Sequence, residues 1–446
     1  MSRGKRPSSG AFEAVNPRAA GIDVGDRVHF VAVPDPSGTP AWRKFDSFTQ
    51  DLHRIADWLE EERITTVALE STGVYWIPLF EVLESRGFTV CLVDTRRLKS
   101  VPGRKTDVKD CQWLQQLHTY GLLQSAFRPD EEVTRLRTYL RQREMLIRYG
   151  SDHIQHMQKA LQQMNIKLST VLSDITGTTG MAILQAILNG ERDPVKLAQL
   201  RNPRCKNSEE TIAKSLEGHW RADHLFELRQ AVDLYHFYGQ KLAECDQQIE
   251  QALESLPDQA TQSERPLKRK KRHTHTPRFD AQGLLFRKAG VDLTTITGID
   301  TNTALKIISE IGTDIRRWPT AKHFASWLCL CPGNKTSGGK VFSTKTRRSK
   351  NRVAAALRMA AQSLERSRTA LGAYFRKMKG RLGAPAAITA AAHKLARLVY
   401  VLLNRGQPYF DMGQEAYEKQ YQARILQTVH RRALQLGYTL VPMAAS

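Results

Sequence analysis

The first third of the chain alternates between short apolar runs and amphipathic stretches. Runs such as AAGIDV and ITTVAL have the length and composition of buried strands, and the polar stretches between them repeat with helical spacing. The pattern predicts strands over 19–24, 28–33, 64–69 and 88–93, and helices over 52–61, 74–85 and about 106–120. Strands that alternate with helices in this way predict a layered α/β domain.

A different pattern begins near Asp130, where apolar residues recur in alternating steps of three and four. The first such seam comprises Val133, Leu136, Leu140, Ile147, Ile154, Met157, Leu161, Met164, Leu168 and Val171, and Arg143 and Gly150 break it. The second comprises Leu228, Val232, Tyr235, Leu242, Cys245, Ile249, Ala252 and Leu256. This repeat is typical of long helices in a coiled coil. The two helices could form one antiparallel hairpin, pair between subunits, or belong to an ordinary bundle.

Beyond these seams the chain first becomes strongly basic and then mainly helical. The segment from Ser263 to Arg278 carries Arg265, Lys268, Arg269, Lys270, Lys271, Arg272 and Arg278 against Glu264 alone. Such a run predicts a linker that binds phosphates. After Gly290 the pattern is mainly helical, and ITGIDTNTALKII from Ile296 resembles a helix-hairpin-helix in which Asp300 replaces the second glycine.

These patterns divide the chain into six segments. They are a disordered basic tail (1–17), an α/β domain (18–128), a helical coiled-coil domain (129–262), a basic linker (263–282), a mainly α-helical domain (283–410) and a C-terminal helical extension (411–446).

Charge narrows the class of partner. The net charge is +22 and the pI is about 9.9, and nucleic acid is the usual partner of such an excess because each neutralised phosphate releases counterions. The sequence contains no run close to the roughly 20 apolar residues of a membrane span, so we expect no membrane partner. The polar N-terminus and six scattered cysteines without a CxxC pair predict an unexported protein with reduced thiols.

Four acidic residues stand where acids are unexpected. Asp23 lies within an apolar strand, Glu70 directly follows another, and Asp107 and Asp110 share one face of a helix. Each alone could be a strand end or a charge at a helix N-terminus. Together they predict a Mg²⁺ site for phosphodiester chemistry, since such sites need several carboxylates from different elements. Basic residues suited to holding nucleic acid lie beside the last two: Arg104, Lys105 and Lys109.

A second candidate site lies in PGNKTSGGK, residues 332–340. Ser337 precedes two glycines, which predicts a loop that a large substrate can approach closely. The basic residues Lys340, Lys345, Arg347, Arg348, Lys350 and Arg352 follow without an acid among them. A free serine is a poor nucleophile, so the residues leave two interpretations open: a plain anion-binding loop, or a site that neutralises a pentacovalent phosphate.

These motifs resemble the DEDD-type insertion-sequence transposases, also called bridge-RNA-guided recombinases. The likeness rests on AGID at 20–23, ALESTGVYW at 68–76, KTDVKD at 105–110 followed by Gln112-Trp113, ITGI at 296–299, PGNKTSGGK, and AHKLAR at 392–397. It spans about 18 to 410. This chain departs from the family by its long middle, its basic linker and the extension 411–446.

The resemblance implies more than the residues alone do. It implies a RuvC-like, RNase H-like fold for 18–128, a transposase domain at 283–410, and Ser337 as the nucleophile that forms a phosphoserine link to DNA. Mg²⁺ held by the four acids would assist. It further implies donor and target DNA and a structured noncoding guide RNA as partners, dimers that assemble to a tetramer with sites shared between subunits, and a bacterial, nucleoid-associated protein of the cytoplasm. We expect RNA contacts at Lys268, Arg269, Lys270, Lys271 and Arg272.

Three other classes of protein fit parts of the pattern. A Holliday-junction resolvase would use the acids alone, and a non-catalytic nucleic-acid scaffold would use neither site, although the presence of all four acids argues against decay. An ATPase of the actin or sugar-kinase type could cradle a phosphate with GIDVG. Such folds need a second glycine-rich phosphate loop, and the sequence has none after a later strand.

Overall fold

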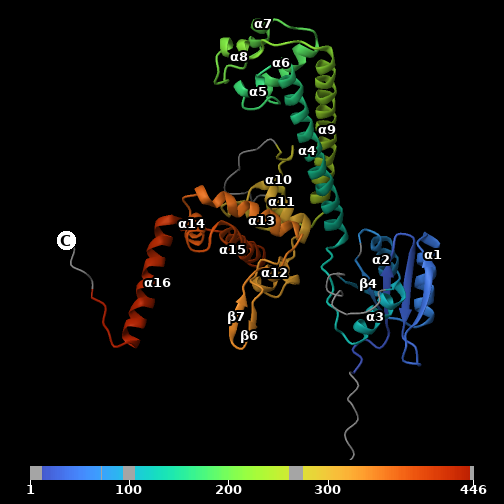
Figure 1. The fold of residues 1–446 in the computed structure, drawn as a ribbon. Helices are drawn as coiled ribbons and strands as arrows, with labels where there is room; N and C mark the ends of the chain where they lie inside the picture. The colour runs from blue at the N-terminus through green and yellow to red at the C-terminus, as the bar shows by residue number, and fades with distance from the viewer. Residues whose placement is uncertain (1–12, 72, 94–105, 261–274, 442–446) are drawn as a thin grey trace, which may run out of the picture. The chain divides into compact units, whose positions relative to one another are not determined.

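The computed structural model describes residues 13–71, 73–93, 106–260 and 275–441, and the chain divides into two compact units, Met1–Arg128 and Pro129–Ser446 (Figure 1). The first unit contains β1 (Ala19–Val24), β2 (Val28–Val33), β3 (Ala41–Asp46), α1 (Thr49–Glu61), β4 (Thr66–Glu70), α2 (Trp76–Ser85), β5 (Thr89–Val93) and α3 (Asp107–Thr119).

The second unit is mainly helical. It contains α4 (Glu131–Gln163), α5 (Leu168–Val171), α6 (Thr178–Leu188), α7 (Pro194–Ala198), α8 (Glu209–Ser215), α9 (Ala222–Glu254), α10 (Ala281–Ala289), η2 (Leu293–Thr295), α11 (Thr301–Ile311), η3 (Ile315–Arg317), α12 (Ala321–Trp327), β6 (Lys335–Ser337), β7 (Lys340–Ser343), α13 (Arg352–Ser363), η4 (Leu364–Arg366), α14 (Ala370–Leu382), α15 (Ala384–Arg405) and α16 (Gly413–Gln435).

The first unit is a mixed sheet covered by helices, in the order β3-β2-β1-β4-β5. The pairs β1–β2 and β2–β3 are antiparallel, whereas β1–β4 and β4–β5 are parallel. This mixed α/β architecture confirms the predicted layered domain and is compatible with an RNase H-like domain. The sequence pattern missed β3, because three consecutive residues of this edge strand are exposed and no apolar run marks it.

The two faces of the sheet carry different helices. Ile22 and Leu69 point into a core with residues of α1 and α2. The residues beside them in register, Gly21 and Ala68, point the other way because strand side chains alternate between faces. Helix α3 packs on that second face, where Ala68 and Leu114 share a small apolar cluster. Side chains at alternate positions of β1 and β4 therefore lie beneath α3.

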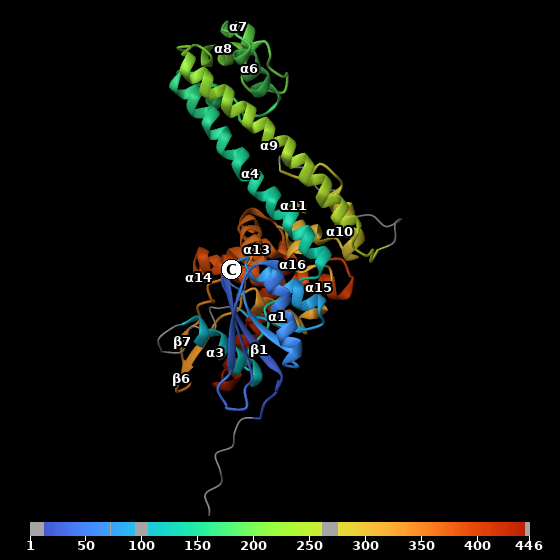
Figure 2. The same cartoon turned by 90° about the vertical axis from the view of Figure 1, so that its right-hand side faces the viewer.

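In the second unit, α4 and α9 are long helices that pack against each other over much of their length (Figure 2). Both predicted helices are confirmed, and they pair within one chain; a coiled-coil geometry stays a prediction. Helix α4 ends at Gln163 rather than continuing to Val171, because Asn165 adopts a left-handed backbone with φ of 58° and turns the chain. Leu168 and Val171, the last two seam positions, are the first and last residues of the separate helix α5.

The two residues that interrupt the first seam both have structural partners on α9. The Arg143 guanidinium donates to the Asp246 carboxylate at 2.6 Å, and both side chains are buried. Gly150 is also buried, and a Cβ there would lie 3.6 Å from Cβ of Tyr238. Since 143 faces 246 and 150 faces 238, the helices run antiparallel. A buried ion pair here specifies the alignment of the two helices, in the way that polar seam residues do.

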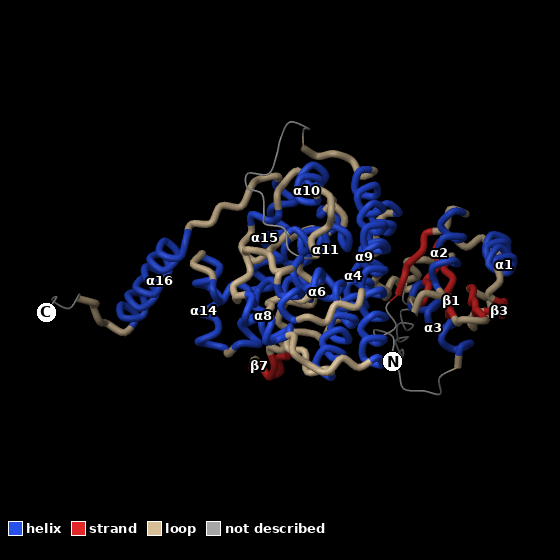
Figure 3. The backbone as a smooth tube through the Cα atoms, turned by 90° about the horizontal axis from the view of Figure 1, so that it is seen from above, coloured by secondary structure: helices blue, strands red, loops and turns tan. Residues whose placement is uncertain are grey.

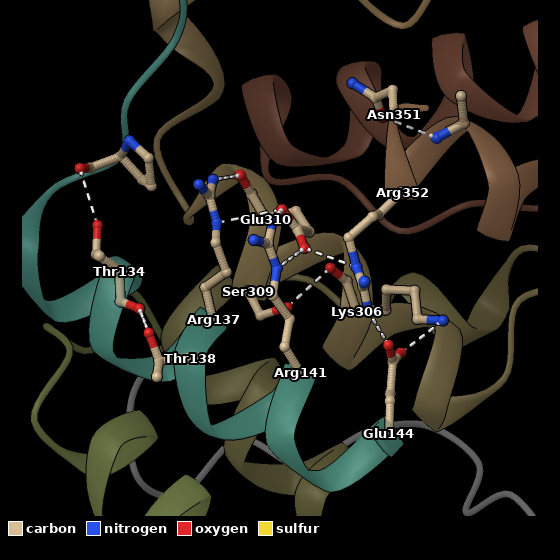
Figure 4. A network of polar contacts seen from close by, with 12 residues as sticks. Thr134, Arg137, Thr138, Arg141, Glu144, Lys306, Ser309, Glu310, Asn351 and Arg352 are labelled. Carbon is tan, nitrogen blue, oxygen red and sulfur yellow. Dashed lines mark hydrogen bonds and ion pairs between the residues drawn. The ribbon is translucent and has the colours of Figure 1, made fainter. Parts of the chain in front are cut away.

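A cluster of charged residues joins the start of α4 to α11 and α13 (Figure 4). Glu310 of α11 accepts from Arg141 at 2.8 and 3.0 Å and pairs with Arg137 and Arg352 at 3.2 Å. Glu144 of α4 pairs with Lys306 at 2.6 Å and also with Arg352. The α4–α9 pair is therefore fixed by ion pairs to the helix that follows the β6–β7 hairpin.

The C-terminal half of the second unit ends in two helices of different character. Among the described residues, α15 alone is long and apolar enough to cross a membrane by length and composition, but only half of that apolar window is buried, and core helices meet the same criterion. Its buried side chains pack with α12, α13 and α14. The predicted C-terminal helix is confirmed as α16, which begins against α14 and has no buried residue (Figure 3).

Candidate active site

Asp23 and Glu70 lie side by side on adjacent parallel strands. Ile22 pairs with Leu69 in register, so the next residues, Asp23 and Glu70, are neighbours on the face that α3 covers. Both are half-buried, and their carboxyl groups share a hydrogen bond. The sequence pattern placed Asp23 within one apolar strand and Glu70 directly after another, and the structure brings them together.

Helix α3 places the other two acids above this pair. It begins at Asp107, and Thr106 caps it by accepting from the Lys109 amide at 3.3 Å. Asp107 and Asp110 are both in the first turn, where the positive end of the helix dipole stabilises carboxylates. Their charges act on Asp23. Glu70, Asp107 and Asp110 are therefore all near enough to Asp23 for their charges to act on it.

Gly21 allows the backbone of α3 to lie very close to strand β1. A Cβ at this position would lie 2.3 Å from the backbone nitrogen of Gln115 and 2.5 Å from the carbonyl oxygen of Cys111. The Gln115 side chain then donates to the Ala19 carbonyl at 3.1 Å, tying helix to strand. A glycine inside a buried strand is a known sign of close backbone approach, and Gly21 is such a glycine that the prediction of the site missed.

The electrostatics of the cluster are those of crowded carboxylates. Burial, the hydrogen bond with Glu70 and the negative charges of Glu70, Asp107 and Asp110 raise the pKa of Asp23 from 3.8 to about 8. Burial and the neighbouring Asp23 also raise the pKa of the Cys111 thiol to about 12. At neutral pH the cluster therefore holds a proton on Asp23, and the adjacent thiol stays protonated.

An oxygen-only set of acidic side chains fits a hard divalent cation such as Mg²⁺. A bound cation would offset the repulsion between carboxylates that are crowded enough to retain a proton. Over the residues that the structure describes, however, no three His, Cys, Asp or Glu side chains are gathered closely enough to form a ready-made metal site. The acids are thus close enough to act on one another without forming a coordination cage.

Ser337 lies on an exposed β-hairpin and not on the loop that the sequence predicted. It is the last residue of β6 and pairs with Lys340, the first residue of β7. Gly338 and Gly339 form the two-residue turn with φ of 53° and 76°, which explains both glycines since this kind of turn needs left-handed backbone. Directly opposed residues share a face, so Ser337 and Lys340 lie together in solvent.

The predicted basic residues divide by whether the structure describes them. Lys109, Lys340, Lys345, Arg347 and Arg348 are exposed. Arg104 and Lys105, and the linker residues Lys268, Arg269, Lys270, Lys271 and Arg272, lie outside the described residues. The exposed cations next to Ser337 give this part of the surface a positive charge that suits a polyanion.

Two comparisons with protein families cover the two candidate sites separately. Residues 20–166, which contain the four acids, match a DEDD transposase domain of the IS110 type. Residues 292–376, which contain Ser337 and the basic residues after it, match a transposase domain described as the IS116/IS110/IS902 family. No curated protein matches the chain. The two domains together span just over half of the 446 residues. The chain therefore belongs to the IS110 family of transposases, and this membership implies a role in DNA transposition and recombination.

Proposed function

We propose that this transposase is an RNA-guided DNA recombinase that exchanges strands between donor and target DNA through a phosphoserine intermediate on Ser337. The observation that carries the proposal is that Glu70, Asp107 and Asp110 all act on Asp23 and, with burial, raise its pKa to about 8. Such a site is suited to a divalent cation and has no evident structural use, because an ion pair would stabilise the fold better than four acids.

The acids would hold Mg²⁺ and supply the oxygen ligands that this ion prefers. Bound there, the ion supplies stabilisation of the negative charge that develops on phosphate oxygens during transfer. Asp23 and Glu70 would hold the ion from the sheet, and the proton that Asp23 carries at neutral pH would have to leave. Asp107 and Asp110 would hold the ion from the first turn of α3, where backbone N–H groups favour anions.

Ser337 would perform the covalent step. Its Oγ attacks a DNA phosphorus, the Oγ–P bond forms, and the bond from phosphorus to one deoxyribose oxygen breaks. The hydroxyl proton passes to that leaving oxygen, so a free strand hydroxyl is produced and the number of phosphoester bonds is unchanged. Lys340, opposite Ser337 in the hairpin, is placed to compensate charge on the phosphate. Attack by a hydroxyl of the partner strand reverses the link.

Covalent trapping tests this chemistry. The protein is incubated with Mg²⁺ and DNA that carries the element's ends, then denatured and digested for mass spectrometry. We expect a nucleotide adduct on the peptide that contains Ser337. An adduct on another residue, such as Thr336 or Ser343, would move the nucleophile, and strand exchange without any adduct would contradict the mechanism.

Guide RNA is the second part of the proposal. It is supported by the excess of 22 positive charges, by the basic run at 268–272 and by the resemblance of the motifs. We expect the protein, purified with nuclease inhibitors, to retain a discrete RNA whose sequence matches DNA flanking the gene and pairs with donor and target sites. Random cellular RNA alone would contradict guidance. Assembly of dimers to a tetramer stays a further part of this proposal.

A further inference from the structure

The hairpin that carries Ser337 also exposes a large aromatic side chain. Phe342 in β7 is 72% exposed, and its neighbour Val341 is 55% exposed. An exposed phenylalanine contributes nothing to the core of the free protein, and it marks a surface only when other features specify a partner.

The backbone turns Phe342 out of the regular pairing. Thr336 pairs with Val341, but the preceding Lys335 pairs with Ser343, so β7 contains one extra residue at this point. That residue, Phe342, is a β-bulge. Bulges redirect a side chain and occur often beside active sites. The bulge begins two positions after Lys340, the residue opposite Ser337, a separation of about 7 Å along the strand.

The charges around Phe342 specify what it contacts. Residues 332–352 contain no acidic residue, and Lys335, Lys340, Lys345, Arg347 and Arg348 are all exposed. A second copy of this surface would be repelled by the same charges. Exposed aromatic rings surrounded by cations are instead typical of surfaces that stack on nucleobases while the cations neutralise the phosphates.

We propose that Phe342 stacks on an unstacked nucleobase within about two nucleotides of the phosphate that Ser337 attacks. It is a positioning residue that holds the strand open next to the reacting hydroxyl. Stacking side chains act in this way when they part successive bases. The positioning role of Phe342 rests on the proposed function of Ser337, but the contact with a base can be measured without any reaction.

Photocrosslinking tests the contact directly. Single-stranded oligothymidylate containing 5-iodouracil is irradiated with the full-length protein, and the crosslinked peptide is identified by mass spectrometry. We expect the crosslink at Phe342 in the unmodified protein and equally in Ser337→Ala. Crosslinks confined to residues outside 335–350 would overturn the inference. A Phe342 crosslink without any phosphoserine adduct would uphold it and reject the Ser337 mechanism instead.

Affinity measurements separate stacking from charge. Phe342→Ala should weaken binding of the same oligonucleotide by roughly 5- to 100-fold, and Phe342→Trp should restore it. The salt dependence should stay unchanged, whereas Arg347→Ala should lower its slope by about one phosphate contact. Phe226→Ala removes a ring that is 64% exposed on α9 and should have no effect. Unchanged binding in Phe342→Ala, or a change only in oligomeric state, would refute the proposal.

Discussion

Replacing Asp23 by asparagine is expected to abolish strand exchange while making the metal-free protein more stable at alkaline pH. The loss follows from removing a carboxylate at the centre of the proposed Mg²⁺ site, since metal-ion catalysis supplies several kcal/mol to phosphoryl transfer. We expect a decrease in rate of roughly three orders of magnitude or more.

The gain in stability follows from the pKa of about 8. Folded Asp23 binds its proton more tightly than the unfolded chain does, so the contribution of the protonated carboxyl is fully present below about pH 4. It is lost as the pH rises through about 8. Asparagine is neutral at every pH and escapes this loss. In chelator, the melting temperature of Asp23→Asn should exceed that of the unmodified protein by about 4 °C or more at pH 9, and by less at pH 5.

Two controls test this prediction. Asp26→Asn changes an exposed acid in the adjacent β1–β2 turn and should alter neither activity nor melting temperature. Added Mg²⁺ should raise the melting temperature of the unmodified protein but not that of Asp23→Asn, because a ligand stabilises only the state that binds it. An active Asp23→Asn protein, or one that is less stable in chelator at pH 9, would contradict the proposed role of the acids.

Ser337→Ala should lose both the covalent adduct and recombination, by roughly 10³- to 10⁶-fold in rate, because the proposed attacking atom is removed. The fold should be unaffected, since Ser337 is exposed on the hairpin. Thr336→Val is the matched control. It removes a hydroxyl at the preceding position, on the opposite face of the same strand, and should leave the adduct intact.

Ser337→Ala also distinguishes the proposed serine mechanism from that of a Holliday-junction resolvase. A Holliday-junction resolvase that uses the acids alone would keep cleaving branched DNA after Ser337→Ala, with Mg²⁺ and without a protein–DNA link. Continued cleavage at the unmodified rate would therefore reject the serine mechanism and retain the metal site. Loss of cleavage in both Ser337→Ala and Asp23→Asn would support a reaction that needs both groups.

Much of the first unit could be predicted because its central strands β1 and β4 are buried on both faces. The run around Ile22 and the run ending at Leu69 have no interpretation other than buried strands, so an acid within or after them is conspicuous. Edge strand β3 could not be found in the same way, because solvent covers most of it. The sequence predicted that Asp107 lies near Asp23, but it did not show that this depends on how closely α3 approaches Gly21.

Local backbone geometry accounts for what the pattern missed in the second unit. Helical spacing continues past Gln163, but one left-handed residue at Asn165 ends the helix. The two glycines after Ser337 indicated close approach of a substrate, and in the structure they are the turn of a hairpin. Along the sequence, Arg143 is a charged residue that interrupts the apolar seam. Only the pairing of helices showed that Asp246 neutralises it.

The anchoring of the α4–α9 pair through Glu310 has a mechanical consequence. Helix α4 has 33 residues and is about 50 Å long, and Arg137 and Arg141 hold it near its first turns. A tilt of about 5° at that end would carry the far end through about 4 Å. Arg352 pairs with the same glutamate and begins the helix after the Ser337 hairpin. A tilt of the α4–α9 pair would therefore be passed through Glu310 and Arg352 to the start of α13, the helix that follows the Ser337 hairpin.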